Sequence, residues 1–354
     1  MKNLISKIAP TIAPFKLSET YTTEILNLLS SVVLGSNGAR YQHQHIERRI
    51  KQLYKPLFIN LERHEKVLGN ITFCRRPTNW YVRYFAFDLN LQANTQQPRS
   101  KAKNSTLKKR VDTFFEGVFI EPIKIGEEAP KRFYAYIDPR NERSLWMSQN
   151  FGFYTVAKIA TQTFSRIKPK KNKDVIVAED RHFIKDKIHD KYHTCPFYFT
   201  EHTFNETPFY TLIKDGEIVA FAKTHRAEWV IERLPGKNGK VLRNIIPFVP
   251  GLNKVIRPNS HEFVVIDSVW CVEHNFEYLE QLFEGILFHE KANTMIWWTD
   301  QKDPIYRKNK RQINWGLLHN LNGAQEVELV IKTPDNKEKE SFDSPTYVTG
   351  FDFI

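Results

Sequence analysis

The residues with the clearest chemistry are a cluster of cations around the start of an expected helix. We expect a helix over residues 105–119. Cations at a helix N-terminus oppose the helix dipole, whereas phosphates are stabilised by the unpaired N–H groups there. The cluster therefore indicates a phosphate-bearing ligand, with a solvated basic face and a nucleic-acid backbone as the alternatives. Its five members are Lys101, Lys103, Lys108, Lys109 and Arg110.

Cysteine and histidine form no recognisable catalytic or metal-binding set. The three cysteines, Cys74, Cys195 and Cys271, have no CxxC spacing, which argues against a disulfide framework and a zinc site. His43 and His45 lack the i,i+4 spacing of metal ligands on a helix, and no Ser-His-Asp arrangement can be recognised. We therefore expect no metal and a reducing, cytoplasmic environment.

The net charge of +12 is unevenly spread over the 354 residues. Residues 1–175 hold 30 Lys/Arg against 14 Asp/Glu, while residues 176–354 hold 22 against 26. The basic half favours an anionic partner: nucleic acid, an anionic membrane surface or a phosphate-bearing cofactor. No run approaches the roughly 18 apolar residues of a membrane span, and Lys7 and Pro10 interrupt the apolar start. We expect a soluble protein with no membrane partner.

The first half alternates helices and strands in the order α-α-β-β-β-α-β-α-β. Apolar spacing and turn residues predict the elements. Their expected ranges are helices at 22–33, 43–54 and 105–119, strands at 57–61, 67–75, 81–87 and 133–137, and a last helix closed by Gly152.

The second half repeats this plan, which indicates an internal repeat. Asp215-Gly216 predicts a hairpin turn, because both residues accept positive φ. The remaining expected elements are strands at 209–213, 218–223, 263–272, 295–299, 327–331 and 347–353, a helix at 276–287 and a helix ending near Leu318.

The segment from Phe133 to Phe153 carries the strongest family signal. It reads as a strand, then Asp138-Pro139, then Asn141 and a short helix closed by Gly152-Phe153. This segment resembles the fifth strand and following helix of the GNAT N-acyltransferase superfamily. The resemblance implies an α/β (α+β) fold with two tandem GNAT-like domains, each a mixed, mostly antiparallel sheet flanked by helices. The expected domains are residues 1–175, with an acyl-CoA site, and residues 176–354, a degenerate copy that binds the acceptor.

The resemblance also implies where acyl-CoA binds. The family holds the pyrophosphate of CoA on a loop with the pattern Arg/Gln-x-x-Gly-x-Gly/Ala before a helix. In this chain the corresponding residues are Arg99, Lys101, Ala102, Lys103, Asn104 and Ser105, and Phe85 and Phe87 lie on the preceding strand. In the second half the corresponding stretch, 267–277, has Glu273 and Glu277 and no glycine, so we expect no second CoA site.

The catalytic residues implied by the resemblance are Asn141, Ser148, Glu62 and Asp88. Many GNAT enzymes place a Tyr acid four residues before the Gly of Gly-Phe, and here that position is Ser148. Asn141 corresponds to a residue that contacts pantetheine or orients a water, and is otherwise a turn residue. Glu62 and Asp88 are the candidate bases, each also readable as a surface charge.

Three functions remain open from the sequence. The first is an N-acyltransferase that moves an acyl group from acetyl-CoA or another acyl-CoA to an amine acceptor. The second is an aminoacyl-tRNA-dependent transferase of tandem-GNAT type, whose basic half would bind RNA. The third is a catalytically silent GNAT-like binding module.

Overall fold

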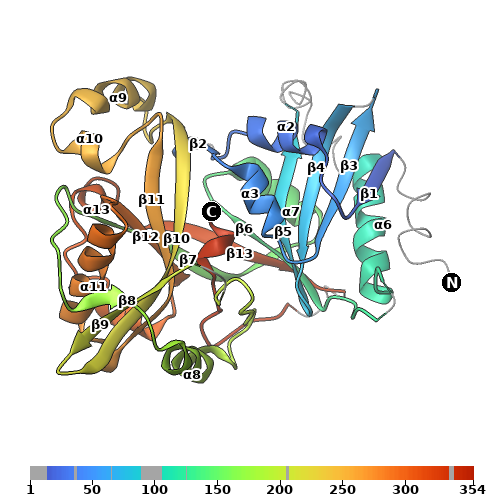
Figure 1. Cartoon of the computed structure of the whole chain (residues 1–354). Helices are drawn as coiled ribbons and strands as arrows, with labels where there is room; N and C mark the ends of the chain where they lie inside the picture. The colour runs from blue at the N-terminus through green and yellow to red at the C-terminus, as the bar shows by residue number, and fades with distance from the viewer. Residues whose placement is uncertain are drawn as a thin grey trace. The chain divides into compact units, whose positions relative to one another are not determined.

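The computed structural model describes residues 14–35, 38–64, 66–88, 106–124, 126–204, 207–334 and 339–354, and these form two compact units (Figure 1). Among the described residues, unit 1 takes those up to Leu34, His45–Val156 and Leu329–Glu340. Unit 2 takes Gly35–Gln44, Ala157–Glu328 and Ser341–Ile354. The chain therefore passes between the units several times, because strands β7 (Tyr154–Ser165) and β13 (Gln325–Lys332) each begin in one unit and end in the other.

The sheet of unit 1 has the strand order β1-β3-β4-β5-β6-β13. The pairings from β1 to β5 are antiparallel, and β5 pairs with β6 in parallel. A segment from near the end of the chain thus completes a sheet built mostly from its first 140 residues. Besides β13, the strands of this sheet are β1 (Phe15–Ser18), β3 (Pro56–Arg63), β4 (Lys66–Arg75), β5 (Asn79–Phe87) and β6 (Arg132–Ile137).

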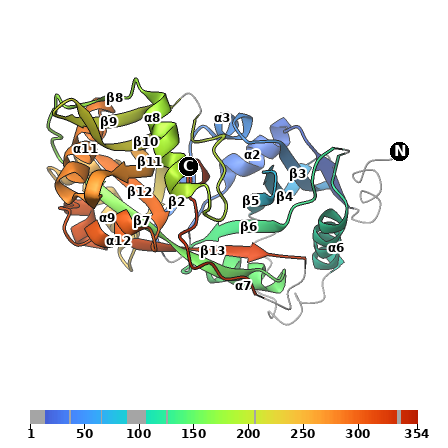
Figure 2. The same ribbon diagram turned by 90° about the horizontal axis from the view of Figure 1, so that it is seen from below.

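Helices cover both faces of this sheet (Figure 2). On one face, α6 (Thr106–Ile120) and α7 (Glu142–Asn150) share an aromatic core with the strands, centred on Phe73, Phe115 and Phe133. The other face carries α2 (Thr23–Ser31), which begins at its N-cap Thr22, and α3 (Ile46–Lys51).

The sheet of unit 2 has the strand order β7-β12-β11-β10-β9-β8, and the short β2 (Arg40–His43) also pairs with β10. Asp215 and Gly216 both have positive φ between β9 and β10, as the hairpin turn requires. The amphipathic helix α11 (Phe276–His289) buries Leu282, Phe283 and Ile286 against the strands. The strands are β8 (Val175–Val177), β9 (Phe209–Lys214), β10 (Glu217–Arg233), β11 (His261–Cys271) and β12 (Thr294–Asp300).

Shorter helices fill the connections of unit 2. Asp180 caps α8 by accepting from two amides of its first turn. The helix expected to end near Leu318 is two helices, and the strand expected at 347–353 is wrong. In its place the chain has an irregular segment and the 3₁₀ turn η3. The shorter helices of unit 2 are α8 (Arg181–Tyr192), α9 (Gly239–Ile245), η1 (Ile246–Phe248), α10 (Leu252–Val255), η2 (Val272–His274), α12 (Pro304–Asn309), α13 (Leu317–Asn322) and η3 (Gly350–Asp352).

The expected fold class is confirmed, since each unit is a mixed sheet flanked by helices. The helix expected over residues 43–54 is shorter, because His43 ends a strand and His45 is the left-handed N-cap of α3. The division at residue 175, with acyl-CoA on one side and acceptor on the other, stays a prediction. The compact units change at Val156, because β7 continues without a break into unit 2.

Candidate functional site

In unit 1, the parallel strands β5 and β6 separate soon after they begin. They pair only over Asn79–Tyr81 and Arg132–Tyr134, although β5 continues to Phe87 and β6 to Ile137. Two residues past the last pair, Arg83 is an extra residue in β5, because its neighbours Val82 and Tyr84 oppose Phe73 and Thr72. Such a bulge bends a strand and increases its twist. Beyond Tyr81 and Tyr134, the described residues of β5 and β6 form no ladder with each other.

Unit 2 also has two parallel strands that separate, followed by a bulge. Strands β11 and β12 pair in parallel only over Val264–Ile266 and Met295–Trp297. Ser268, with φ of 49°, is the extra residue of β11 against β10. In both units the bulge lies two residues beyond the last parallel pair, and it lies on the first strand of that pair along the chain, β5 in unit 1 and β11 in unit 2.

Carboxylates of β11 and β12 hold the chain's own C-terminal segment. Asp300, on β12, accepts hydrogen bonds from the amide and the hydroxyl of Thr346, each at 2.7 Å. Asp267, on β11, accepts from the amide of Gly350 and from the hydroxyl of Thr349, and is bonded to His225 at 2.8 Å. A Cβ on Gly350 would lie 2.9 Å from the His225 ring, so only glycine fits this approach.

Both carboxylates are buried. Burial alone would raise the pKa of Asp267, but the charge of His225 and the hydrogen bonds from His225, Ser268 and the Gly350 amide outweigh it, so the pKa lies below its ordinary value. These buried carboxylates therefore anchor the C-terminal segment to β11 and β12 beyond the last pair of the two strands.

In unit 1 the separated part of β5 carries aromatic and cationic groups. The ring of Phe85 lies 5.3 Å from that of Phe87 and 5.9 Å from that of Phe151, on the side of α6. The guanidinium of Arg83 lies 5.3 Å from the ring of Tyr84. The Tyr84 hydroxyl is buried and has no hydrogen-bond partner among the residues that the structure describes. A buried phenol without a partner is unusual and marks a position that a ligand can complete.

Positive charge gathers beside Tyr84. Burial, Arg83 and Arg48 together lower the pKa of Arg49 to about 10. Since Arg49 lies on α3 and Arg83 on β5, two separate elements bring these cations together. Neither Tyr84 nor Arg49 has a local sequence signal for this role, because each lies within a regular element, β5 or α3.

Two of the predicted catalytic residues lie on α7. Asn141 is its N-cap, and its Oδ1 accepts from the Ser144 amide at 3.1 Å. The Ser148 hydroxyl donates to the Leu145 carbonyl at 2.8 Å. Both side chains therefore have structural contacts within the helix, which restricts the chemistry that they are free to perform.

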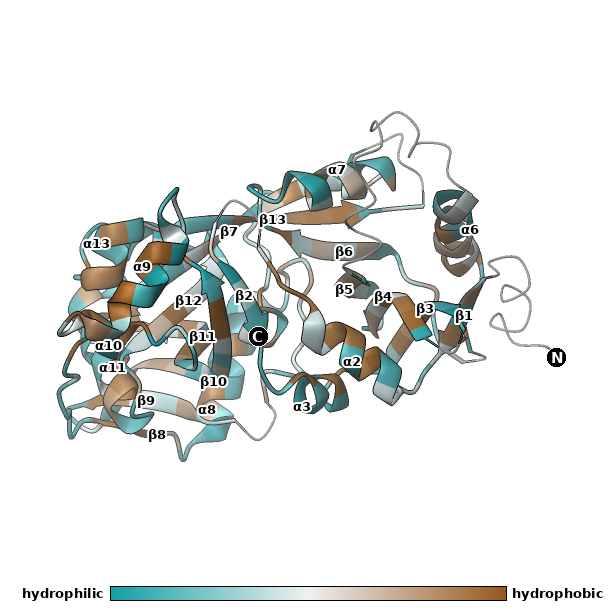
Figure 3. Cartoon of the chain, turned by 90° about the horizontal axis from the view of Figure 1, so that it is seen from above, coloured by the Kyte–Doolittle hydropathy of each residue, from teal (hydrophilic) through white to brown (hydrophobic). Residues whose placement is uncertain are grey.

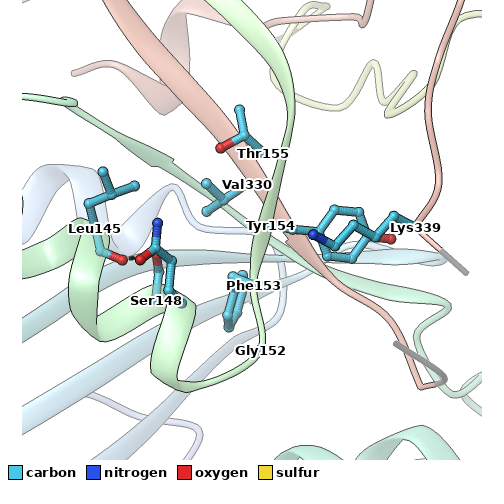
Figure 4. A pocket seen from close by; sticks show the side chains of 9 residues that line it. Leu145, Ser148, Gly152, Phe153, Tyr154, Thr155, Val330 and Lys339 are labelled. Atoms are coloured by element: carbon cyan, nitrogen blue, oxygen red, sulfur yellow. Dashed lines mark hydrogen bonds between the residues drawn. The ribbon is translucent and has the colours of Figure 1, made fainter. Parts of the chain in front are cut away.

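Ser148 also lines a pocket of about 460 Å³ in unit 1 (Figure 4). Leu145, Phe153 and Val330 form apolar walls. The ammonium of Lys339 lies 5.8 Å from the ring of Tyr154, and the Tyr154 hydroxyl accepts from the Glu340 amide. The pocket falls in the size range of small-molecule sites and combines apolar walls with one cation.

The predicted bases lie elsewhere in unit 1. Glu62 forms an ion pair with Lys16 at 2.6 Å and lines a separate hollow that shares no residue with the pocket of Figure 4. The backbone of Asp88, just past β5, donates to Leu68. Through the register Leu61–Gly69–Phe87, both carboxylates fall at the end of the sheet where β5 has left β6.

The predicted pyrophosphate loop, Arg99, Lys101, Ala102, Lys103, Asn104 and Ser105, lies outside the described residues. Of the cations that follow it, Lys108 forms an ion pair with Asp112 at 2.8 Å, while Lys109 is exposed. The phosphate-binding role of these residues remains a prediction.

Metal and thiol chemistry find no support within the described part of the chain. No three His, Cys, Asp or Glu side chains come together there in a way that would hold a metal ion. All three cysteines are buried, and none forms a disulfide within the part of the chain that the structure describes. Burial raises the pKa of Cys195, and raises that of Cys271 to about 11, so neither is an activated thiolate.

Comparison with known proteins adds a fold and no closer relationship. The sequence matches no protein-family profile and no curated protein. Saccharomyces cerevisiae N-myristoyltransferase with bound myristoyl-CoA matches with a TM-score of 0.51 at 8% identity, over 91% of this chain and 79% of that one. A GCN5-related N-acetyltransferase from Sphaerobacter thermophilus matches with a TM-score of 0.47 at 10% identity, over 94% and 99%. The chain has the fold of the GNAT-type acyltransferases.

Proposed function

We propose that the protein is an N-acyltransferase that binds acyl-CoA in unit 1, between β5 and β6, and transfers the acyl group to an amine. One observation carries this proposal. The two units share the bulged divergence, but in unit 2 carboxylates beside it hold the chain's own C-terminal segment, whereas in unit 1 no described strand pairs with β5 on this side beyond Tyr81. An extended chain bound there would add to the edges of β5 and β6 as a strand does.

The pantetheine arm of CoA is chemically suited to such a site. It is an extended chain with two amide groups, which can hydrogen-bond to a strand edge as an added strand does. At its other end, the pyrophosphate would be met by the cations before and within the first turns of α6, including Arg99, Lys101 and Lys109. Phe85 and Phe87 would line the path between.

The proposed reaction is direct. The amine attacks the thioester carbonyl carbon, a C–N bond forms, the C–S bond breaks, and CoA leaves as a thiol after the amine has lost a proton. Backbone N–H groups beside the Arg83 bulge would stabilise the oxyanion of the tetrahedral intermediate. The raised pKa values of Cys195 and Cys271 favour direct attack over an acyl-enzyme.

Proton transfer needs an acid and a base near the thioester. The Ser148 hydroxyl already donates to Leu145, so we assign the acid role to Tyr84, whose hydroxyl is buried beside the bulge without a described partner. Asn141 would act by fixing the start of α7. Glu62 and Asp88 stay the candidate bases, and the pocket beside Ser148 would give room to the acyl group.

A silent binding module is favoured by one observation, the Ser at position 148 with its hydroxyl already engaged. An aminoacyl-tRNA-dependent transferase is favoured by the basic balance of residues 1–175. A silent module would bind acyl-CoA without releasing thiol, and an aminoacyl-tRNA-dependent transferase would not need acyl-CoA at all.

Calorimetry with acetyl-CoA, a long-chain acyl-CoA and CoA tests the proposal, combined with a thiol-release assay over a panel of amines. Binding with amine-dependent thiol release is the expected result. Binding without release supports the silent module, and no binding at millimolar acyl-CoA contradicts the proposal. A variant with Cys74, Cys195 and Cys271 all replaced by Ala should keep its activity; loss of activity in a folded variant would contradict direct attack.

A further inference from the structure

The densest group of exposed apolar residues in unit 2 lies on residues 234–260, the segment that connects β10 to β11 and which we call the β10–β11 excursion. It contains α9, η1 and α10. Five large apolar side chains are exposed within nine residues of it, and Phe248 is 84% exposed. These five are Val241, Leu242, Ile245, Phe248 and Val249. The ribbon of α9 carries hydrophobic positions in Figure 3. A soluble surface seldom concentrates apolar side chains in this way without a partner.

The apolar row is held rigidly outward. Val241, Ile245 and Phe248 recur at i, i+4 and i+7 along the continuous helical path of α9 and η1, which places them on one face. Ile246 points the other way into a buried cluster with Val255, Ile256, Ile231 and Leu318 of α13. Arg243 ties the helix to the sheet by donating to the Ile231 carbonyl at 2.6 Å. The exposed row is therefore a packed feature and not a loose loop.

The same surface is strongly basic. Between Glu232 and Glu262 the chain has six Lys/Arg and no Asp/Glu. Lys237, Lys240, Lys254 and Arg257 are exposed and make no ion pair within the described residues.

A second basic segment adjoins the excursion. Residues 166–173 hold five Lys/Arg and no acidic residue. They reach the excursion because a Cβ on Gly251 would lie 3.1 Å from Ile167, which is itself exposed. Asn293 holds this segment by donating to the carbonyls of Arg166 and Ile167. Apolar and cationic groups thus share one surface of unit 2.

We propose that this surface, the β10–β11 excursion with residues 166–173, binds the surface of an anionic lipid membrane. Phe248 and the apolar row enter the interface, and the lysines and arginines meet lipid phosphates and carboxylates. Basic residues beside an apolar helix face are the usual composition of such interfacial elements. A nucleic acid would use the charges but has no use for exposed Val, Leu and Ile, since base binding relies on aromatic stacking. No helix among the described residues is long and apolar enough to cross a bilayer.

Co-sedimentation of the full chain with vesicles tests this proposal. Vesicles of phosphatidylcholine with about 30% phosphatidylserine should bind the protein, and pure phosphatidylcholine should bind it much less. Ile245→Ser with Phe248→Ser should weaken binding by about tenfold or more, because two apolar anchors are lost. Lys240→Glu with Lys254→Glu should also weaken binding to these vesicles by at least about tenfold. Ile120→Ser is the matched control, since Ile120 is also 84% exposed but lies in unit 1.

The outcomes separate the two kinds of polyanion. Absence of binding to phosphatidylserine vesicles overturns the proposal. So does a charge variant that loses binding while the apolar variant keeps it, above all if the wild type also binds a mixed tRNA pool, because that pattern describes a nucleic-acid surface. Phe248→Trp gives a second readout: its fluorescence should shift to the blue on anionic vesicles, and an unshifted spectrum with bound protein would exclude insertion of this residue. Far-UV circular dichroism checks that each variant is folded.

Discussion

In unit 1, β5 leaves β6 beyond Tyr81; in unit 2, β11 leaves β12 beyond Ile266. In each unit a bulge lies two residues past the last pair, at Arg83 in unit 1 and at Ser268 in unit 2. The side chains at these places differ. Unit 2 presents two buried carboxylates that hold the C-terminal segment, whereas unit 1 presents cations and a phenol.

The comparison suggests that the same backbone feature, a bulge beside two separating parallel strands, can either anchor a segment of the chain or offer a site for a ligand. A bulge opens a gap between strands whatever its sequence, and the residues that face the gap decide what completes it. Carboxylates that accept from backbone amides anchor a peptide segment permanently. Cations and an unpartnered hydroxyl suit an anionic ligand that comes and goes.

The largest expected effect is on the anchored side. Asp267→Asn should lower the free energy of unfolding by about 3–5 kcal/mol, because it removes the negative charge that is paired with the buried His225 ring. The matched change in unit 1 is Asp138→Asn, whose exposed pair with Arg140 should contribute less than about 1 kcal/mol. Urea unfolding of both variants measures the difference, and equal losses would contradict the distinction.

The stability from Asp267 should also depend on pH. Its pKa in the folded protein lies below the ordinary value, so its contribution is complete above the unfolded pKa of about 4 and is lost as the pH falls through the folded pKa. The gap between wild type and Asp267→Asn should therefore be constant from pH 5 to 7 and shrink in more acidic solution. A gap that grew on acidification would have the wrong sign.

Tyr84→Phe tests the reactive side. Its hydroxyl has no described partner, so the fold should be unaffected, while the rate of thiol release should fall by about a hundredfold or more. Affinity for acyl-CoA should change little. Tyr21→Phe, which removes an exposed hydroxyl from the same unit, is the control. Full activity in Tyr84→Phe would remove this residue from the reaction.

A smaller effect is expected at the predicted phosphate loop. Arg99→Ala with Lys101→Ala should weaken CoA binding by about 1–3 kcal/mol, because charge-assisted hydrogen bonds contribute about that much. Lys168→Ala with Lys170→Ala removes the same charge from unit 2 and should leave the calorimetric affinity unchanged. Similar losses in both double variants would indicate a general charge effect and no specific site in unit 1.

Ser148 should have the smallest effect. Since its hydroxyl donates to Leu145, Ser148→Ala should change turnover by less than about threefold while loosening α7 slightly. Steady-state thiol release measures this. A loss as large as that of Tyr84→Phe would return the acid role to Ser148.

Local patterns predicted much of this fold. The Asp215-Gly216 turn, the strands β3 to β6 and the helix α11 follow from alternation, turn residues and apolar spacing, all of which act within a few residues. The strand β2 escaped prediction because its four residues pair with β10, which lies far along the chain. The segment 347–353 reads as a strand from its composition. The Gly350 amide of this segment instead donates to the side chain of Asp267, an interaction that no local pattern contains.

The candidate site was less predictable than the fold. Asn141 was recognised as a special position, but its role as a helix cap follows from the Ser144 amide three residues away and gives no catalytic signal. Tyr84 went unnoticed, because an aromatic residue in a strand is ordinarily core and only the bulge at Arg83 distinguishes it. Bulges have no sequence signature of their own here. The site therefore emerges only when register is known.

Hydrogen exchange with and without a saturating acyl-CoA tests the central claim most directly, because it reports on both divergences in one experiment. The account predicts slower exchange of amides in the separated parts of β5 and β6 and at the start of α6, and no change in β11, β12 or the segment 346–352. Protection of β11 and β12, or of neither pair of strands despite measurable acyl-CoA binding, would contradict it.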